Sequence, residues 1–496
     1  MDSCPRPISN GMKIKTATYD IKKAPKKYVR LVITEEKNGH KFMETKAGTV
    51  EFRMGTGKWG DMTPRKFRIF IRSLVQAAKN HNIEYLVVQL ANSPFPKLQS
   101  MGEEWVMRTI SENLSLAFYE FKKYKTSKTS KKGLKEIVLC GKFSAEQKRA
   151  LSKGLLVATY ANKARDIANT TGEEMTPKIL AEAAVNLASG TKVSVRVLDE
   201  KAIKKENLHA LWAVGKGADD MPRFIIMEYW PLGKPLSNEK RRKKKDEKNE
   251  NSNLDRKPIV LIGKGITYDT GGLNVKPSGA MHEMHLDMSG GASVIAAIVL
   301  AAKLGVQKNI VALVPAAENA VSAKSMRAGD ITKSHSGKTI EVLHTDAEGR
   351  MILADAFSYA KSYDPRVIID VATLTGASLV ALGQQASAVM TEDKDLQEKL
   401  QAYGEESGDY VWPLPLWDEY KALLKSDRAD VVNINPSFSK FGGVIEGAAF
   451  LSFFAPKCPW AHIDMAPRME SIPTDKLEKG ATGEPTRLLI RFLESY

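Results

Sequence analysis

The chain has 496 residues, which at roughly 150 residues per domain predicts two or three domains. Hydrophobic residues make up 43% of it and charged residues 27%, which excludes a disordered, collagen-like or disulfide-framework chain. The unusual number is the charge, because 74 Lys and Arg oppose 58 Asp and Glu for a net +16. Such a balance suggests binding to nucleic acid or to a membrane surface.

The positive surplus is confined to three short segments. Residues 13–30, 121–135 and 239–257 carry net charges of +6, +7 and +4, so the rest of the chain is close to neutral. Almost no apolar side chain occurs in 237–257, which predicts a basic surface insertion. Lys-rich loops are usually only solvated, but nucleic-acid binding through these segments, with the remaining chain as a scaffold, stays open as an alternative function.

The cysteines and the apolar runs indicate a compartment. Cys4, Cys140 and Cys458 are far apart and form no CxxC pair, which fits a reducing, intracellular environment. The first thirty residues lack the apolar core of a signal peptide, and the longest apolar run, 292–302, is too short to span a membrane. We therefore expect a cytoplasmic protein with no membrane partner.

The first part of the chain alternates between two kinds of hydrophobic pattern. Helical periodicity and short apolar runs predict a helix, a strand, a helix and a strand at 63–81, 83–90, 103–125 and 135–141. This order predicts a small N-terminal α/β domain, placed at 1–150. A long helical pattern from about 144 to 169 follows, and we expect a linking helix at 151–172.

The second part alternates again. Strands are predicted at 193–199 and 224–230, before the basic insertion, and beyond Pro258 further strands alternate with helices: strands at 258–264, 309–316, 337–344 and 366–374, helices at 288–305 and 347–363. This rhythm predicts a larger catalytic α/β/α domain, 173–496, with a mostly parallel central sheet. In such sheets ligands bind beyond the carboxyl ends of the strands.

Charged residues follow these predicted strands. Lys264 ends one strand, Asp269 lies five residues on, Asp287 opens the next helix, and Asp346 and Glu348 come after the strand at 337–344. Any one of these carboxylates alone is more often a helix cap. Four carboxylates at one sheet edge would repel each other unless cations held them together, so divalent metal ions are the expected occupants. Two shared ions would explain so many carboxylates and would supply a bridging hydroxide.

Other hydrolytic motifs are missing from the sequence. His282 and His285 are three residues apart rather than the four of HExxH, so we expect them to be surface residues. No GxSxG elbow occurs, and the isolated cysteines have no catalytic signature around them. Metal-assisted attack by water is the hydrolytic chemistry that remains.

The segments GKGITYDTGGLNVKPSGAMHEMHLDM, at 263–288, and HTDAEGRMILADA, at 344–356, resemble the leucyl aminopeptidase (cytosol aminopeptidase) family, whose signature segment is NTDAEGR. Further segments resemble the family in the same order: ARDIANTTGEEMTP, DVATLTGA, WPLPLWDEY, SDRADVVNI, PWAHIDMA and GATGEPTRLL. The resemblance spans about 160–496, whereas the first 145 residues match only in size and α/β character.

The resemblance implies a metal-dependent aminopeptidase with two divalent ions per subunit, Zn or Mn, with Mg or Co as further candidates. It assigns one ion to Asp269, Asp346 and Glu348, and the other to Lys264, Asp269, Asp287 and Glu348. Lys264 can ligate only as the neutral amine, which requires the nearby cation to depress its pKa.

The same resemblance assigns the catalytic side chains. Lys276 would stabilise the developing gem-diolate oxygen, and Arg350 would hold a bicarbonate that acts as general base toward the bridging water. The substrates would be peptides with a free N-terminus, because the neutral α-amine would coordinate one ion. Leu or Met is expected as the first residue, because two Met side chains in the implied pocket can adapt to them. The implied pocket positions are Met284, Thr373, Gly376, Ala466 and Met469. A homohexamer is implied by the resemblance alone.

Two positions depart from the family pattern. His344 stands where the signature has Asn. We expect a supporting histidine with its hydrogen bonds satisfied, and the alternative is that it orients Asp346 and adds a titration near neutral pH. Pro467 and Arg468 replace the usual glycine and small residues, so the shape of the pocket depends on where they lie.

Overall fold

The computed structural model describes residues 13–36, 39–44, 49–89, 95–126, 133–234, 256–439 and 441–496. The chain divides into two compact units, unit 1 with Met1–Asn162 and Ser471–Lys479, and unit 2 with Lys163–Glu470 and Gly480–Tyr496. The sequence alone did not assign Ser471–Lys479 to the N-terminal part. The domain boundaries expected from the sequence, 1–150, 151–172 and 173–496, stay a prediction. The insertion predicted at 237–257 lies outside the described residues up to 255.

Unit 1 contains a mixed sheet. Its strands, among the described residues, lie in the order β1 (Lys13–Ala17), β6 (Glu136–Cys140), β5 (Tyr85–Val88), β2 (Val29–Thr34), β4 (Val50–Gly55) and β3 (Gly39–Glu44). Only the pair β3 and β4 is antiparallel among these neighbours. The strands predicted at 83–90 and 135–141 are therefore present, as β5 and β6.

The helices of unit 1 pack their apolar faces on this sheet. Among the described residues they include α1 (Pro64–Asn80), α2 (Pro96–Gln99) and α3 (Gly102–Phe118), which share one apolar cluster with strands of the sheet, and α1 contacts α3. Thr63 caps α1 by accepting a hydrogen bond from the Lys66 N–H, and Pro64 occupies the first turn. The helix α3 ends at Phe118, short of the predicted 125, and a lysine-rich segment follows. The helix predicted near 144–169 is α4 (Ala145–Ala168).

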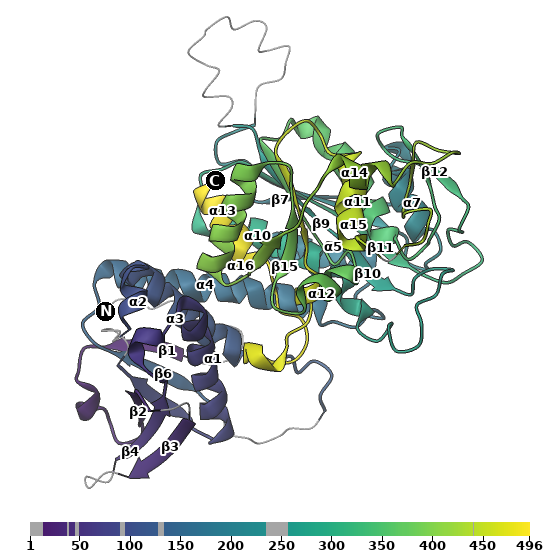
Figure 1. The fold of residues 1–496 in the computed structure, drawn as a ribbon. Coiled ribbons are helices and arrows are strands. Elements are labelled where there is room, and N and C mark those ends of the chain that lie inside the picture. Colours follow the sequence, from purple (N-terminus) through teal and green to yellow (C-terminus); the bar gives the residue numbers. More distant parts are fainter. Residues whose placement is uncertain are drawn as a thin grey trace, which may run out of the picture. The chain divides into compact units, whose positions relative to one another are not determined.

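Unit 2 is built on a larger sheet (Figure 1). Among the described residues its strands lie in the order β16 (Val411–Pro413), β15 (Ser387–Met390), β18 (Trp460–Asp464), β14 (Val367–Ala372), β9 (Ile259–Gly263), β11 (Ile310–Asn319), β8 (Arg223–Tyr229) and β7 (Ser194–Leu198), and β10 (Gly265–Asp269) pairs with β11. The four central strands β18, β14, β9 and β11 are parallel. The mostly parallel central sheet is confirmed.

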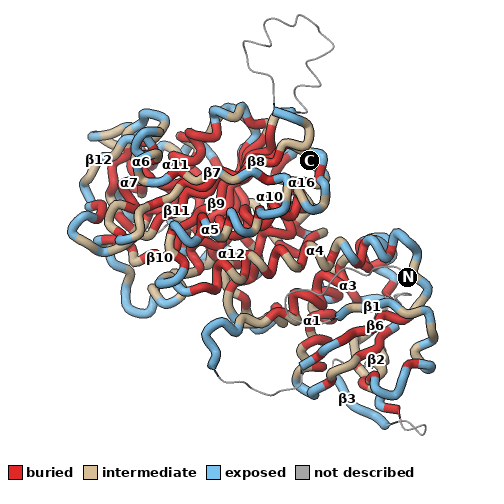
Figure 2. Tube along the Cα trace, turned by 180° about the vertical axis from the view of Figure 1, so that it is seen from behind, coloured by how far each residue is buried: buried red, intermediate tan, exposed pale blue. Residues whose placement is uncertain are grey.

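Helices cover both faces of this sheet. Val260 and Ile262 of β9 belong to an apolar cluster with side chains of α7 (His209–Gly215), α11 (Glu348–Ala360) and α15 (Gly443–Ser452). The helix α10 (Ser289–Leu304) also contacts β9, but none of its residues is in that cluster, so it covers the opposite face. Figure 2 shows the buried strands at the centre of this unit. Further α-helices among the described residues of unit 2 are α5 (Pro177–Ala188), α6 (Glu200–Lys205), α12 (Ala377–Leu382), α13 (Lys394–Ser407), α14 (Asp418–Ala422) and α16 (Thr486–Ser495).

One predicted strand has a different place. Of the strand expected at 337–344, only Thr339–Glu341 is extended, as β13, and it pairs with β12 (Ile331–Lys333) and β17 (Val431–Val432) in a separate three-stranded sheet of the described chain. The expectation that it belongs to the central sheet was wrong. Its short apolar run satisfies the pattern of a buried strand but does not determine which strands it pairs with.

The helical segment Met284–Leu304 has the length and mean hydropathy of a membrane span, but most of it is buried inside the unit. That burial is typical of a core helix.

Candidate metal centre

The parallel strands of unit 2 bring polar residues to one edge of the central sheet. Lys264 follows β9, Asp269 ends β10, and Thr373 follows β14. Asn319 ends β11 at the same edge, where the Thr270 N–H donates to its carbonyl oxygen. This is the carboxyl edge, where sheets of this kind bind ligands.

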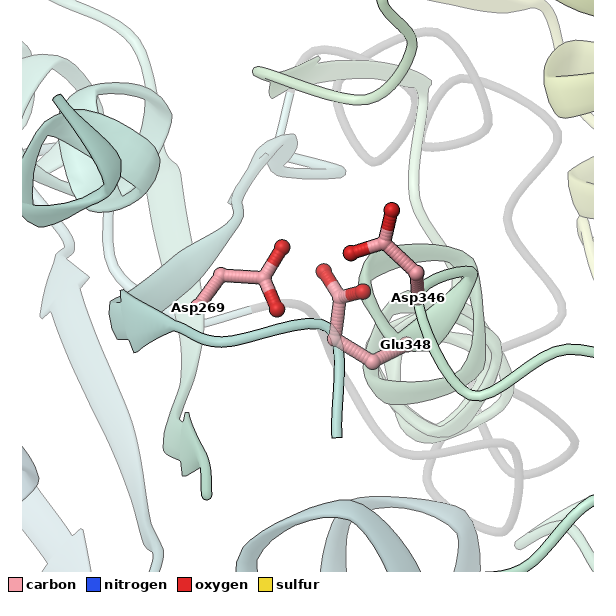
Figure 3. A group of neighbouring side chains, drawn as sticks. All are labelled: Asp269, Asp346 and Glu348. Carbon is pink, nitrogen blue, oxygen red and sulfur yellow. The ribbon is translucent and has the colours of Figure 1, made fainter. Parts of the chain in front are cut away.

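Three carboxylates meet there. One oxygen each from Asp269, Asp346 and Glu348 lies within 4.8 Å of the other two. Figure 3 shows Asp269 reaching from its strand toward Glu348, the first residue of α11, and toward Asp346, in the loop just before that helix. Asp269 and Glu348 are buried and Asp346 is partly buried. Sequence reasoning predicted this convergence, although Asp346 arrives from a loop after β13 and not from a strand of the central sheet.

Two lysines compensate the carboxylates. Lys264 Nζ lies 2.8 Å from Asp287 Oδ2 and 2.9 Å from Glu348 Oε1, and it donates to the Thr373 carbonyl oxygen at 2.9 Å. Lys276 Nζ lies 2.7 Å from Asp269 Oδ2 and also pairs with Asp346. The two lysines therefore pair with different carboxylates, Lys264 with Asp287 and Glu348 and Lys276 with Asp269 and Asp346.

Burial dominates the protonation of the cluster. It raises the pKa of Glu348 to about 7, with the Asp269 charge adding to the shift, and it raises the pKa of Asp287 to about 7 against the effect of Lys264. It also raises the pKa of Asp346 to about 6. Burial opposes ionisation of Asp269 as well, but Lys276 and Lys264 hold the pKa of Asp269 below its usual value. The two lysines therefore do not fully offset the penalty that burial imposes on the ionised carboxylates.

The residues present fit a divalent cation. Glu348 Oε2 is buried with no hydrogen-bond partner among the described residues, so this oxygen is a free ligand atom. Carboxylate oxygens with a neighbouring amine suit Zn and Mn. The family resemblance assigns one ion to Lys264 together with three carboxylates. Lys264 contacts two of these carboxylates, Asp287 and Glu348.

Arg350 lies two residues after Glu348, in the first turn of α11. Its Nη1 donates to the Asn433 carbonyl oxygen at 2.8 Å, whereas its buried Nε has no hydrogen-bond partner among the described residues. Burial lowers the pKa of Arg350, and Glu446 and Glu348 oppose that shift. A buried guanidinium with an unused donor fits a small anion.

The predicted pocket positions lie around the same edge. Thr373 Oγ1 donates to Asp287 Oδ1 at 2.7 Å, so this residue supports a carboxylate of the cluster. Gly376 is exposed, and a Cβ atom there would meet nothing within 4 Å. Met469 packs against an apolar cluster of Ala168, Leu286 and Ala481, and Leu286 immediately precedes Asp287. Ala466 is buried just after β18, and Met284 is partly buried, at the start of the 3-10 helix Met284–Met288.

The two departures from the family pattern have clear positions. His344 Nδ1 accepts a hydrogen bond from the Asp346 N–H at 3.3 Å, so it contacts Asp346. Arg468 is buried in an ion pair with Glu484, at 2.8 Å from Nη2 to Oε1, and its Nη1 donates to the Gln384 carbonyl oxygen. Its charge is therefore already satisfied.

The two histidines of HEMH differ in exposure. His282 is exposed as expected, whereas His285 is partly buried and burial lowers its pKa.

Sequence reasoning missed three polar residues of this edge. Asn319 Nδ2 donates to Asp269 Oδ1 at 2.8 Å and to the Thr345 carbonyl oxygen at 3.1 Å, and Asn274 bonds to Thr345. Asn319 had a usable signal, because it is the polar residue that ends a long apolar strand. Asn274 and Thr345 had none, since they are far apart in the sequence.

Comparisons with known proteins identify the family of this chain. The family model described as "Cytosol aminopeptidase family, catalytic domain" matches residues 162–490. The probable cytosol aminopeptidase of Azoarcus sp. (strain BH72) is 37% identical over 442 residues, which cover 88% of this chain and 83% of that protein. The probable cytosol aminopeptidase of Syntrophotalea carbinolica is 41% identical over 394 residues, covering 78% and 75% of the two chains.

Solved structures are similar over almost the whole chain. The bottromycin maturation enzyme BotP in complex with Mn is 29% identical with a TM-score of 0.80, covering 95% of this chain and 99% of that one. A mutant of tomato leucine aminopeptidase is 25% identical with a TM-score of 0.83, covering 98% and 97%. With its acidic cluster at the carboxyl edge of the sheet, this chain belongs to the cytosol aminopeptidase family and is a metal-dependent aminopeptidase.

Proposed function

We propose that unit 2 releases N-terminal amino acids from peptides at a site that holds two divalent ions, Zn or Mn. The observation that carries this proposal is the buried cluster of Asp269, Asp346 and Glu348, with an unpartnered oxygen on Glu348. These three residues would hold one ion. Lys264 and Asp287, together with Asp269 and Glu348, would hold the other. When bound, the ions would polarise the scissile carbonyl and activate water.

Lys276 and Arg350 have separate roles in this proposal. Carboxylate neighbours raise the pKa of Lys276 although burial opposes them, so its ammonium stays protonated and can stabilise the negative charge that develops on the carbonyl oxygen. Arg350 would hold a bicarbonate through its Nε–H, which has no partner among the described residues, and a bicarbonate held there could supply the general base. A separate general base is needed, because the carboxylates of the cluster pair with lysines or would bind the ions. The bicarbonate would fill this role.

Specificity follows from the site's surroundings. A free α-amine would be anchored at the cluster, so an acylated peptide would lose that anchor. The first side chain would lie among Met284, Thr373, Gly376, Ala466 and Met469. Open space at Gly376 and the adaptable Met side chains favour Leu and Met as first residues.

We further propose a homohexamer in the cytoplasm. Unit 2 exposes large apolar side chains, including Phe441 at 89% and Trp417 at 61%, which are typical of a surface that buries against another chain. The name of the related cytosol aminopeptidases supports the location. Light scattering would test the assembly. The basic segments that would bind nucleic acid lie only partly within the described ranges, and no observation on the described part favours such binding.

The main test is hydrolysis of Leu-p-nitroanilide by the purified full chain. We expect activity to be lost on chelation and restored by Mn or Zn, with two ions per chain by elemental analysis, and no hydrolysis of N-acetyl-Leu-p-nitroanilide. Activity without metal, or equal cleavage of the acetylated substrate, would refute the proposal.

Variants would test the residue roles. Glu348→Gln should lower kcat at least about 100-fold with loss of bound metal, whereas Glu398→Gln, an exposed residue of α13, should not. In bicarbonate-depleted buffer, added bicarbonate should stimulate the native chain but not Arg350→Ala. Equal stimulation of both would remove Arg350 from that role.

A further inference from the structure

Residues 270–276 form a short loop that carries Lys276 to the acidic cluster. Side chains along it alternate in exposure, since Leu273 and Val275 are 44% and 53% exposed, whereas Asn274 and Lys276 are partly buried. Lys276 thus lies on the side of the loop that faces Asp269 and Asp346.

Thr345, the neighbour of Asp346, closes the loop from the other side. Its N–H donates to Asn274 Oδ1 at 2.8 Å, and the Asn274 N–H donates back to Thr345 Oγ1 at 2.8 Å. The Thr345 hydroxyl in turn donates to the Gly271 carbonyl oxygen at 2.6 Å. Thr345 has no exposed surface, so water cannot replace these bonds without opening the site.

The base of the loop is fixed to the sheet. The Thr270 N–H and hydroxyl both donate to the Asn319 carbonyl oxygen, at 3.1 and 2.7 Å, and the Lys276 N–H donates to the Thr270 carbonyl oxygen at 2.9 Å. Asn319 Nδ2 also joins Asp269 to the Thr345 carbonyl oxygen. The backbone of Lys276 is therefore tied to β11, and its loop to the residue that precedes Asp346.

Glycines allow the close approach of the two segments. Gly272 has a φ of 65°, and a Cβ atom there would lie 2.9 Å from Thr345 Oγ1. Gly271 has a φ of 87°, and a Cβ there would lie 2.5 Å from the Asn274 carbonyl oxygen. A side chain at 272 would separate the loop from Thr345, and a side chain at 271 would push apart the backbone of the loop itself.

We propose that Thr345 and Asn274 are positioning residues that fix the loop 270–276 and so aim the Lys276 ammonium at the reacting carbonyl. This inference rests on the proposed role of Lys276. A lysine side chain is long and flexible, and its four-carbon stem gives it many positions. Hydrogen bonds to Asn319 on one side and to Thr345 on the other fix the loop that carries Lys276. They reduce the number of positions open to its ammonium before substrate binds, and such preorganisation raises the rate of the chemical step.

The test is a pair of variants at one position in the full metal-loaded enzyme. Thr345→Val keeps the shape of the side chain but removes the hydroxyl that donates to Gly271 and accepts from Asn274. We expect kcat for Leu-p-nitroanilide to fall about 10- to 100-fold, with KM within about twofold and two ions still bound. Thr345→Ser, which restores the hydroxyl, should recover most of kcat.

Thr391→Val is the matched control. The Thr391 hydroxyl also donates to a backbone carbonyl oxygen, that of Trp460 at 2.6 Å, and accepts from the N–H two residues on, but it lies away from the cluster. We expect it to lower the melting temperature and leave kcat unchanged. A fall in kcat with Thr391→Val equal to that with Thr345→Val would show a general effect of lost stability and overturn the proposal.

A double variant separates this inference from the proposed function. In a Lys276→Met background, Thr345→Val should cause no further fall in kcat, because the group it positions is gone. An equal fall in both backgrounds, or loss of bound metal in Thr345→Val, would overturn the inference. If Lys276→Met alone leaves kcat unchanged, the proposed role of Lys276 fails, and the inference with it. Should Thr345→Val not fold, Asn274→Ala replaces it, with the same expectations.

Discussion

Gly349 lies directly against the end of the Lys264 side chain. A Cβ atom at this glycine would be 2.5 Å from Lys264 Cε and 2.7 Å from Nζ. Lys264 cannot move aside, because it is buried and its Nζ contacts Asp287, Glu348 and the Thr373 carbonyl oxygen. The absence of a side chain at 349 is therefore a condition for the position of Lys264.

Gly349→Ala should displace Lys264 and weaken binding of the ion that Lys264 is proposed to share. We expect the affinity for Mn at that site to fall at least tenfold, by about the amount that loss of a supporting contact costs. Calorimetric titration of the metal-free chain with Mn would measure it. Gly60→Ala, where a Cβ would meet nothing within 4 Å, is the control. Unchanged binding in Gly349→Ala would contradict the argument.

His344 supports Asp346 through its Nδ1, which accepts the Asp346 N–H. An asparagine would accept the same N–H two residues on, as in an Asx turn, so His344→Asn should keep kcat/KM within about twofold. His344→Ala leaves this N–H without its partner, which costs about 1 kcal/mol, or roughly fivefold in kcat/KM. Steady-state kinetics at saturating Mn would compare them, with the exposed His282→Ala as control. Equal activity of the Asn and Ala variants would exclude the supporting role.

Asp355 predicts a pH dependence of stability. It is buried in α11, where it accepts the Leu211 and His335 N–H groups at 2.9 and 2.7 Å, but burial outweighs these bonds and raises its pKa to about 7. A raised folded-state pKa stabilises the fold fully below the unfolded value of about 4. That contribution is lost as pH rises through 7, by up to about 1.4 kcal/mol per pH unit.

Asp355→Asn cannot ionise and lacks this dependence. The free energy of unfolding of the native chain minus that of the variant should therefore fall between pH 4 and 7 and stay level above that. Urea unfolding at a series of pH values would measure the difference. A difference independent of pH would mean that Asp355 keeps an ordinary pKa in the fold.

Arg468 and Glu484 form a buried pair in which Nε and Nη2 both donate to the carboxylate, at 3.2 and 2.8 Å. Arg468→Ala should lower the free energy of unfolding by about 3 kcal/mol, because it leaves the buried Glu484 carboxylate with the more distant Arg487, at 3.9 Å. The preference for Leu over Ala as first residue should stay the same. The control Arg149→Ala breaks an exposed pair with Glu146 and should cost less than about 1 kcal/mol. A changed preference would place Arg468 in the substrate pocket.

The sequence by itself predicted much of unit 2 because its strands are buried on both faces. Continuous apolar runs such as Ile259–Gly263 and Val367–Ala372 leave little choice but a covered parallel strand, and the charged residue that follows such a run must lie at the carboxyl edge. Lys264 and Asp269 could be placed this way from local pattern alone. The motif around Asp346 and Glu348 indicated the family. The family resemblance in turn suggested roles for residues that hydrophobic periodicity cannot assign.

Only the tertiary structure decided which distant segments meet. It places β13 in a small separate sheet, pairs Arg468 with Glu484, and assigns Ser471–Lys479 to unit 1. It also joins Asn274 to Thr345. The physical reason is that hydrophobic periodicity reports which face of a local segment is buried, whereas pairing across many residues depends on packing and on reciprocal hydrogen bonds. Those bonds need both partners in place, and neither partner alone carries a signal of the other.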